Sequence, residues 1–320
     1  MRYENIVTGT FLRRPNRFLA YVLLGETKPG NAESGHAGPA GYTGPADAGE
    51  TATALDGSHP REVVCHVKNT GRLGELLLPG CRVLLEYHPD AEAAGRKTQY
   101  SLVGVYKKDA LGEGREILVN IDSQSPNRIA EECLAGGGFS RIFGRMLPEI
   151  TGGQGAEAAG GAFPEIAGEQ FPEITCIRRE VTYGNSRFDL AFSLGETPAF
   201  MEVKGVTLER DGIAMFPDAP TERGVKHLRE LIRARENGCE AFVLFVIQHE
   251  GVRGFTPNAG MHPEFARALK EAQEAGVHVL AGSCRVEFVN GADAEAADAN
   301  GMGTLSVELE QAVEICYSEC

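Results

Sequence analysis

The sequence predicts a two-domain protein, with an all-β OB-like barrel at its N-terminus and an α/β domain at its C-terminus. Its 320 residues exceed the usual length of one domain. Residues 1–110 hold short β-branched and aromatic runs separated by Gly or Pro, whereas strand-like and helix-like runs are mixed within 111–320. Hydrophobic residues at 42% and charged residues at 24% are typical of a globular chain, which excludes a fibrous protein.

The first domain is expected to contain five strands, because five runs alternate with Gly- or Pro-containing connections. They lie at 6–12, 17–24, 61–68, 81–87 and 99–106. Five strands with basic loops suit an OB-like barrel, and an SH3-like barrel would give much the same pattern.

The second domain is expected to be an α/β sandwich around a mixed sheet. A short helix at 129–134 precedes three strands in a meander at 176–183, 188–194 and 199–206. A helix over 221–237 ends at Gly238, and the continuous apolar run 241–248 is typical of a strand buried on both faces. A helix at 263–275 and a strand at 277–281 complete the order.

Three segments are poor in large apolar residues and rich in Gly, Ala, Pro and acidic residues. They span 28–60, 152–169 and 290–303. Such segments cannot bury enough apolar surface to offset the entropy lost on ordering, so we expect mobile surface insertions that carry no chemistry.

The chain lacks the signals of secretion and membrane insertion. Its eight cysteines include no C-x-x-C pair, which argues against a structural zinc site and a disulfide scaffold. No apolar run approaches the roughly 20 residues of a membrane span, and the first residues do not resemble a signal peptide. We therefore expect reduced thiols, a cytoplasmic protein and no membrane partner, while a homo-oligomer is compatible with the sequence.

Charge is distributed unevenly between the two domains. The chain carries 31 Lys and Arg against 45 Asp and Glu, a net charge of −14. Residues 1–110 hold 13 basic and 12 acidic residues, net +1, and residues 111–320 hold 18 and 33, net −15. Without 28–60 the first domain carries 12 basic and 8 acidic residues, net +4. A basic barrel beside an acidic domain keeps a nucleic-acid partner open despite the overall charge.

Arginines in one barrel loop are the candidates for phosphate contacts. Arg13, Arg14 and Arg17 lie close together where the first strand gives way to the second. We expect them to bind nucleic-acid backbone without sequence preference, since phosphate contacts carry no base information. Ordinary surface arginines are an equally weighted alternative.

Two carboxylates and a lysine on adjacent predicted strands form the candidate catalytic group. Glu202 and Lys204 share a strand face, and an antiparallel hairpin would bring Asp189 to Glu202. Carboxylate oxygens are the ligands that Mg²⁺ and Mn²⁺ prefer, and Lys204 would orient the water that attacks phosphorus. Glu180 on the preceding strand is a candidate third metal ligand. The alternative is an exposed strand ion pair of little energetic weight.

The helix expected from residue 221 adds candidate phosphate-binding residues. Thr221 and Arg223 in its first turn, with the partial positive charge of the helix N-terminus, would face phosphate oxygens. His227 is expected beside Arg223 on the face opposite the apolar stripe. The alternative is the solvated face of an amphipathic helix.

The motifs together resemble the sugar fermentation stimulation protein A (SfsA) family. The resemblance rests on FPDAPTERGVKHLREL at 216–231, RFDLAF at 187–192, EVKGVTL at 202–208 and NTGR at 69–72. It implies an N-terminal OB fold, a C-terminal domain like the PD-(D/E)xK nucleases and non-specific DNA binding. Asp189, Glu202 and Lys204 match the nuclease-like triad, and Asn69-Thr70-Gly71 match a barrel motif whose role stays open.

Two functions follow as hypotheses. The first is a DNA-binding protein with a Mg²⁺- or Mn²⁺-dependent phosphodiesterase site. The second is a non-catalytic, sequence-nonspecific DNA-binding regulatory protein linked to sugar metabolism. A sugar-metabolising enzyme finds no support, because the chain has neither a G-x-G-x-x-G cofactor loop nor a Walker A motif.

Overall fold

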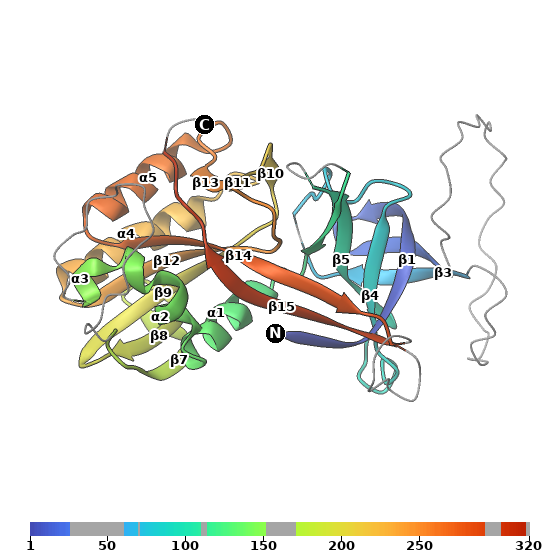
Figure 1. Ribbon diagram of the computed structural model, residues 1–320, viewed down its shortest axis with the longest axis horizontal. Helices are drawn as coiled ribbons and strands as arrows, with labels where there is room; N and C mark the ends of the chain where they lie inside the picture. Colours follow the sequence, from blue (N-terminus) through green and yellow to red (C-terminus); the bar gives the residue numbers. More distant parts are fainter. Residues whose placement is uncertain (26–60, 70, 110–113, 152–170, 292–301, 318–320) are drawn as a thin grey trace.

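The computed structural model describes residues 1–25, 61–69, 71–109, 114–151, 171–291 and 302–317. The insertions expected at 28–60 and 152–169 lie entirely outside these residues, as does most of the one expected at 290–303. The described residues form a barrel and an α/β domain that share strands (Figure 1).

The first domain is a closed barrel of five strands. They are β1 (Arg2–Asn16), β2 (Leu19–Leu24), β3 (Arg61–Val67), β4 (Arg82–Tyr87) and β5 (Tyr100–Lys108). They pair in the order β1-β2-β3-β5-β4-β1, with β3 and β5 parallel. The barrel interior is filled by inward side chains that include Phe11, Val22, Cys65, Val83 and Leu102. All five expected strands are therefore present.

A sixth strand extends the first domain beyond the expected boundary at residue 110. Strand β6 (Glu116–Asn120) pairs antiparallel with β5, from Gly104 opposite Asn120 to Lys108 opposite Glu116. Its Ile117 and Val119 are buried. The boundary lies near residue 120, because a break at 110 would separate the two strands of one hairpin.

The second domain is a mixed sheet with helices on both faces. Its strands are β7 (Ile174–Tyr183), β8 (Ser186–Leu194), β9 (Thr197–Val206), β12 (Glu240–Ile247) and β14 (His278–Val289). Strands β9, β12 and β14 are parallel, while β7, β8 and β9 form the expected antiparallel meander. Helices α1 (Ser125–Ala135) and α2 (Gly138–Phe143) cover one face, and α4 (Glu222–Glu236) and α5 (Pro263–Glu274) cover the other. Two short helical segments follow α2, at Gly144–Met146 and Pro148–Thr151 (α3).

The central strand β12 is buried on both faces, as its apolar run predicts. Phe242 and Leu244 pack on the side of α1, whereas Val243 and Phe245 pack on the side of α4 and α5. This position fixes the neighbouring β9, which carries Glu202 and Lys204, in the middle of the sheet.

Two long strands join the domains, and the sequence expectation captured only part of them. Strand β14 runs to Val289 rather than to residue 281, because its second half pairs with β15 (Gly303–Ala312). Strand β15 also pairs with the first residues of β1, with Arg2 opposite Ser306, so one 12-stranded sheet runs through both domains (Figure 1). Strand β15 is not among the expected elements, although Leu305, Val307 and Leu309 alternate with polar residues.

A buried polar seam fixes the barrel against the second domain. Gln248 Nε2 donates to Asn120 Oδ1 at 2.8 Å and to Ser125 Oγ at 3.0 Å. Lys107 Nζ and Glu209 Oε2, 2.7 Å apart, form a second link. Because these groups are largely buried and hydrogen-bonded to one another, they hold the two domains in one relative position.

A small second sheet leads the chain into α4. It consists of β10 (Glu209–Arg210), β11 (Ile213–Phe216) and β13 (Gly254–Pro257). No helix among the described residues is long and apolar enough to cross a membrane.

Candidate functional site

The carboxylate of Glu202 is the centre of the candidate site. It lies on β9, is 2% exposed, and points toward α4. Its Oε1 accepts from Lys204 Nζ at 2.5 Å and from His227 Nδ1. Its Oε2 is buried and has no hydrogen-bond partner among the described residues. The two oxygens of Glu202 therefore differ, because one accepts two hydrogen bonds and the other accepts none from the described residues.

His227 holds Glu202 rather than facing solvent. Its ring is buried, and Arg223 Nε donates to its Nε2 at 3.3 Å, which leaves Nδ1 to donate to Glu202. This corrects the expectation that His227 lies opposite the apolar stripe of α4 as a nucleic-acid-binding residue. Gly224 and Glu230 are buried as well, so the buried stripe of the helix is wider than the apolar residues alone indicate.

The buried environment has opposite net effects on the two carboxylates. Burial would raise the pKa of Glu202, but the hydrogen bonds from His227 and Lys204 and the charge of Lys204 outweigh it, so this pKa is lowered. Burial, and then the charge of Glu202, raise the pKa of Asp189. The unfavourable effects of burial and of the neighbouring negative charge therefore raise the pKa of Asp189 and not that of Glu202.

Asp189 is positioned by backbone and side-chain donors. Its Oδ2 accepts from Val203 N at 2.8 Å, and its Oδ1 accepts from Asn127 Nδ2 at 2.8 Å. The antiparallel pairing of β8 with β9 ends at Leu190 and Met201, and Asp189 lies one residue beyond that pair, near enough to Glu202 for its charge to act on it. The structure therefore brings Asp189, Glu202 and Lys204 together, and it adds Asn127, which no sequence motif marked.

Glu180 is not part of this group. Its side chain is 62% exposed and pairs with Arg187 at 3.2 Å. Its φ of 54° interrupts the regular alternation of β7, the strand at the sheet edge. The expectation that Glu180 is a third metal ligand is corrected accordingly.

The residues expected at the start of α4 have mixed roles. Thr221 is the N-cap, and its Oγ1 accepts from Gly224 N at 3.1 Å. Its backbone N donates to His262 Nδ1 at 3.3 Å. Arg223 is exposed, so the outer part of its guanidinium remains accessible.

The three arginines of the barrel loop differ from one another. Arg13 pairs with Glu62 at 3.1 Å and stacks on Tyr21. Arg14 is a structural clamp, because its two terminal nitrogens donate to four backbone carbonyls, those of Arg17, Asn69, Gly71 and Arg72. Arg17 is exposed and makes no side-chain ion pair or hydrogen bond among the described residues. Of these three arginines, Arg17 is the one whose guanidinium has no partner among the described residues, as the expected phosphate contact requires.

The clamp explains part of the barrel motif at 69–71. Asn69 Oδ1 accepts from Gly71 N at 2.7 Å, and Asn69 Nδ2 donates to Ile121 O at 2.9 Å. A β carbon at Gly71 would lie 2.9 Å from both Asn69 Oδ1 and Asp218 Oδ2, so a larger residue there would displace these side-chain ends. Thr70 lies outside the described residues.

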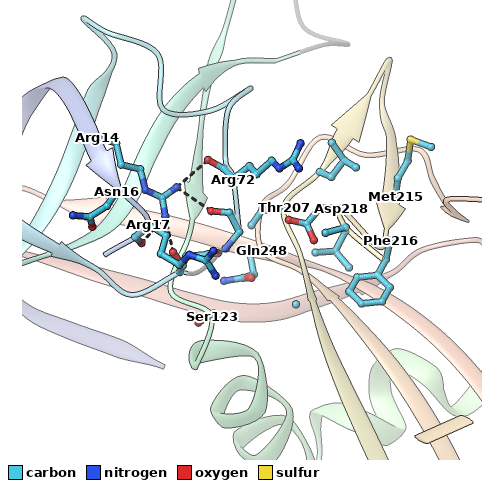
Figure 2. Close-up of a pocket in the computed structure, with 16 residues that line it drawn as sticks. Arg14, Asn16, Arg17, Arg72, Ser123, Thr207, Met215, Phe216, Asp218 and Gln248 are labelled. Atoms are coloured by element: carbon cyan, nitrogen blue, oxygen red, sulfur yellow. Dashed lines mark hydrogen bonds between the residues drawn. The ribbon is translucent and has the colours of Figure 1, made fainter. Parts of the chain in front are cut away.

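A cleft of about 650 Å³ lies between the two domains, next to the carboxylate site (Figure 2). The barrel contributes one wall, with Arg17 and Arg72, and the second domain contributes the other, with Met215 and Phe216. Gly205 and Val206 also line it, directly after Lys204 on β9. The cleft was not foreseen from the sequence, although Arg72 belongs to the NTGR motif.

A second group with metal-binding residue types lies at the ends of α4 and α5. Ligand atoms of Glu222, His262 and Glu264 lie within 4.8 Å of one another. His262 Nδ1 accepts from Thr221 N, and Glu264 pairs with Arg229 at 2.8 Å. Because Nδ1 accepts, Nε2 carries the ring hydrogen and is not free to bind a metal.

Two family models match the sequence, one for each domain. The model described as the SfsA N-terminal OB domain matches residues 12–121. The model described as the sugar fermentation stimulation protein RE domain matches residues 124–289. The first match supports the OB topology over the SH3-like alternative.

Relatives match over most of their length. A sugar fermentation stimulation protein homolog from Desulfitobacterium hafniense is 39% identical over 286 residues, covering 89% of this chain and 92% of the relative. The homolog from Clostridium beijerinckii is 38% identical over 287 residues, covering 90% and 94%.

A solved structure shares the fold. The structure of Pyrococcus furiosus SfsA in complex with Ca²⁺ aligns with 99% of this chain and 98% of its own, with a TM-score of 0.62 and 23% sequence identity. At that identity the likeness concerns the fold alone.

Proposed function

We propose that this chain, which belongs to the sugar fermentation stimulation protein family, binds DNA and hydrolyses phosphodiester bonds with Mg²⁺ or Mn²⁺ at Asp189, Glu202 and Lys204. The observation that carries the proposal is the Oε2 atom of Glu202, which is buried without a partner among the described residues, close to a second carboxylate. A buried unpartnered carboxylate oxygen is unfavourable unless a cation or donor satisfies it.

The residues present fit a divalent cation. Asp189 and Glu202 would hold it, since both offer carboxylate oxygens at a largely buried position. The solved Pyrococcus furiosus SfsA is a complex with Ca²⁺, a cation with the same preference for oxygen ligands. The cation would supply positive charge that offsets the charge developing on phosphate.

The neighbouring residues orient the two acids and the attacking water. Lys204 and His227 hold Glu202 Oε1 and thereby aim Oε2, while Asn127 and the Val203 amide hold Asp189. The Lys204 ammonium, partly buried at 2.5 Å from Glu202, is suited to orient a water molecule and stabilise the charge of the transition state. The residue pattern and the geometry support a PD-(D/E)xK nuclease-like assignment of the domain.

Binding to DNA would be sequence-nonspecific. Arg17, Arg72 and Arg223 are exposed cations of the described residues that suit phosphate contacts. The acidic overall charge makes such binding dependent on local positive potential and on the cation.

Cleavage assays test the proposal. Single- and double-stranded DNA and RNA are incubated with wild type in Mg²⁺, Mn²⁺ or EDTA, beside Glu202→Ala and the control Glu180→Ala. We expect cleavage in Mn²⁺ or Mg²⁺ by wild type and by Glu180→Ala, and none in EDTA or by Glu202→Ala. DNA binding without cleavage of any substrate would favour the second hypothesis, a non-catalytic DNA-binding regulatory protein linked to sugar metabolism.

A further inference from the structure

The cleft between the domains has two walls of different chemistry. On the barrel side, Arg17 and Arg72 point into the cleft, and neither guanidinium has a hydrogen bond or ion pair among the described residues (Figure 2). On the opposite side, Met215 presents a thioether, and Phe216, whose ring packs on Phe245 and Phe265, lines the cleft with the part that stays exposed. Cations on one wall and apolar groups on the other match the two parts of a nucleotide.

The cationic wall is rigid. Arg14 donates to the carbonyls of Arg17, Gly71 and Arg72, so the backbone that carries both free arginines is clamped (Figure 2). The charged residues that line the cleft in the described part of the chain are three arginines and Asp218, which favours a polyanion. Because the wall is held in place before binding, little entropy is lost when phosphates dock.

The apolar wall indicates whether a bound nucleic acid would be single-stranded or double-stranded. In a duplex the bases are stacked inside, and only sugars and phosphates face an apolar surface. In a single strand every base exposes a ring face that stacks on aromatic side chains. A cleft of about 650 Å³ also has room for one or two nucleotides.

We propose that this cleft binds single-stranded nucleic acid, with phosphates on Arg17 and Arg72 and bases against Met215 and Phe216. The inference rests on the proposed function and names its substrate class. Gly205 and Val206 line the cleft directly after Lys204, so a strand bound there runs beside the carboxylate site. A β carbon on Gly205 would lie 2.8 Å from Oε1 of Gln248, which also lines the cleft, so a larger residue at this position would displace that side chain.

Fluorescence anisotropy tests the inference without depending on cleavage. The probes are labelled oligo-dT and oligo-rU of about 12 nucleotides, a hairpin duplex, and an abasic strand of equal length, in EDTA and in Ca²⁺. The variant Arg17→Ala/Arg72→Ala is compared with Arg267→Ala/Lys270→Ala, which removes two exposed charges from α5, away from the barrel (Figure 1).

We expect a single strand to bind more tightly than the duplex and the abasic strand. Each lost phosphate contact lowers the salt slope by about 0.7, so the cleft variant should lower the slope by about 1.4 and weaken binding on the order of 20-fold at 0.1 M salt. The α5 variant should change neither. Tighter binding of oligo-dT or of oligo-rU identifies the natural strand as DNA or RNA.

Several results would overturn the inference. They are equal affinity for duplex and single strand, equal affinity for the abasic strand, no binding by wild type, or equal losses in the two variants. Cleavage by wild type combined with any of these would leave the proposed function standing. Cleft-dependent single-strand binding without cleavage in Mn²⁺ or Mg²⁺ would instead retain the cleft and remove the catalytic assignment.

Discussion

The backbone N–H of Val203 donates to Asp189 Oδ2 at 2.8 Å, so the pairing of β8 with β9 itself positions the first acid of the site. Asp189 is therefore held near Glu202 by hydrogen bonds to its own side chain, from Val203 N and from Asn127 Nδ2, just beyond the last paired residues of the hairpin, Leu190 and Met201. These two donors keep the carboxylate of Asp189 in place even though the charge of Glu202 repels it.

Neutralising Asp189 should remove an unfavourable charge when no cation is present. Burial and the charge of Glu202 raise the pKa of Asp189, so its ionised form is less favourable in the folded chain than in the unfolded chain. Asp189→Asn removes this charge, although its amide cannot accept from both Asn127 Nδ2 and Val203 N. Relative to wild type, its melting temperature in EDTA should therefore be most favourable at pH 7 and should fall as pH falls toward the ordinary pKa of an aspartate. Calorimetry at several pH values measures this difference, and a difference that does not change with pH would contradict the assignment.

Neutralising Glu202 should have the opposite effect. Its pKa is lowered because hydrogen bonds from His227 and Lys204 outweigh burial, so the ionised form stabilises the folded chain above the ordinary glutamate pKa. Glu202→Gln should lower the melting temperature in EDTA at pH 7, and the loss should disappear as pH falls through the lowered pKa. Repulsion between the acids alone predicts the same pH trend for both variants, so opposite trends in the same calorimeter separate the two explanations.

Arg14→Ala should destabilise the barrel by about 3 kcal/mol, because it removes charged donors from four backbone carbonyls. Burial, and then the charge of Arg17, lower the pKa of Arg14, but it stays charged at neutral pH. Arg14→Lys should not restore stability, since an ammonium cannot replace the planar fork. Urea denaturation compares these variants with Arg17→Ala, whose exposed side chain should contribute little to stability. Equal effects of Arg14→Ala and Arg17→Ala would refute the clamp.

His249 should make the protein less stable as pH falls from 6.5 to 4. Burial, and then the charge of Lys107, lower its pKa from 6.5 to about 4, so the unfolded chain binds more protons in this range. The loss is about 3 kcal/mol over the interval. In His249→Asn, urea denaturation should show a flatter pH dependence between these values, and an unchanged slope would show that another group titrates.

The sequence predicted the parts of the site that strand alternation controls. Glu202 and Lys204 share a face because they are two residues apart on one strand, and Asp189 lies near Glu202 because the antiparallel hairpin brings the neighbouring residues Leu190 and Met201 together. His227 was assigned to the wrong face of its helix. A polar residue can belong to the buried stripe of a helix when it hydrogen-bonds to the sheet beneath, as His227 does to Glu202. Asn127 had no signal, since its role depends on the tertiary contact between α1 and β8.

The fold shows the same division between local pattern and long-range contact. The five barrel strands and the buried strand β12 follow from local composition. The extension of β14 to Val289 and the pairing of β15 with β1 depend on contacts between distant parts of the chain, which no local pattern specifies. The cleft is likewise formed only when Arg72 and Phe216 are brought together by the packing of the two domains.

Titration of the folded protein with Mn²⁺ in a calorimeter tests the central claim most directly. The claim predicts one Mn²⁺ site in wild type that is lost in both Asp189→Asn and Glu202→Gln and kept in Glu222→Gln, which alters the other carboxylate and histidine group. Thermal melts of each variant establish that it is folded before titration. Binding that survives in Asp189→Asn and Glu202→Gln, or that is lost only in Glu222→Gln, would contradict a catalytic cation at Asp189 and Glu202.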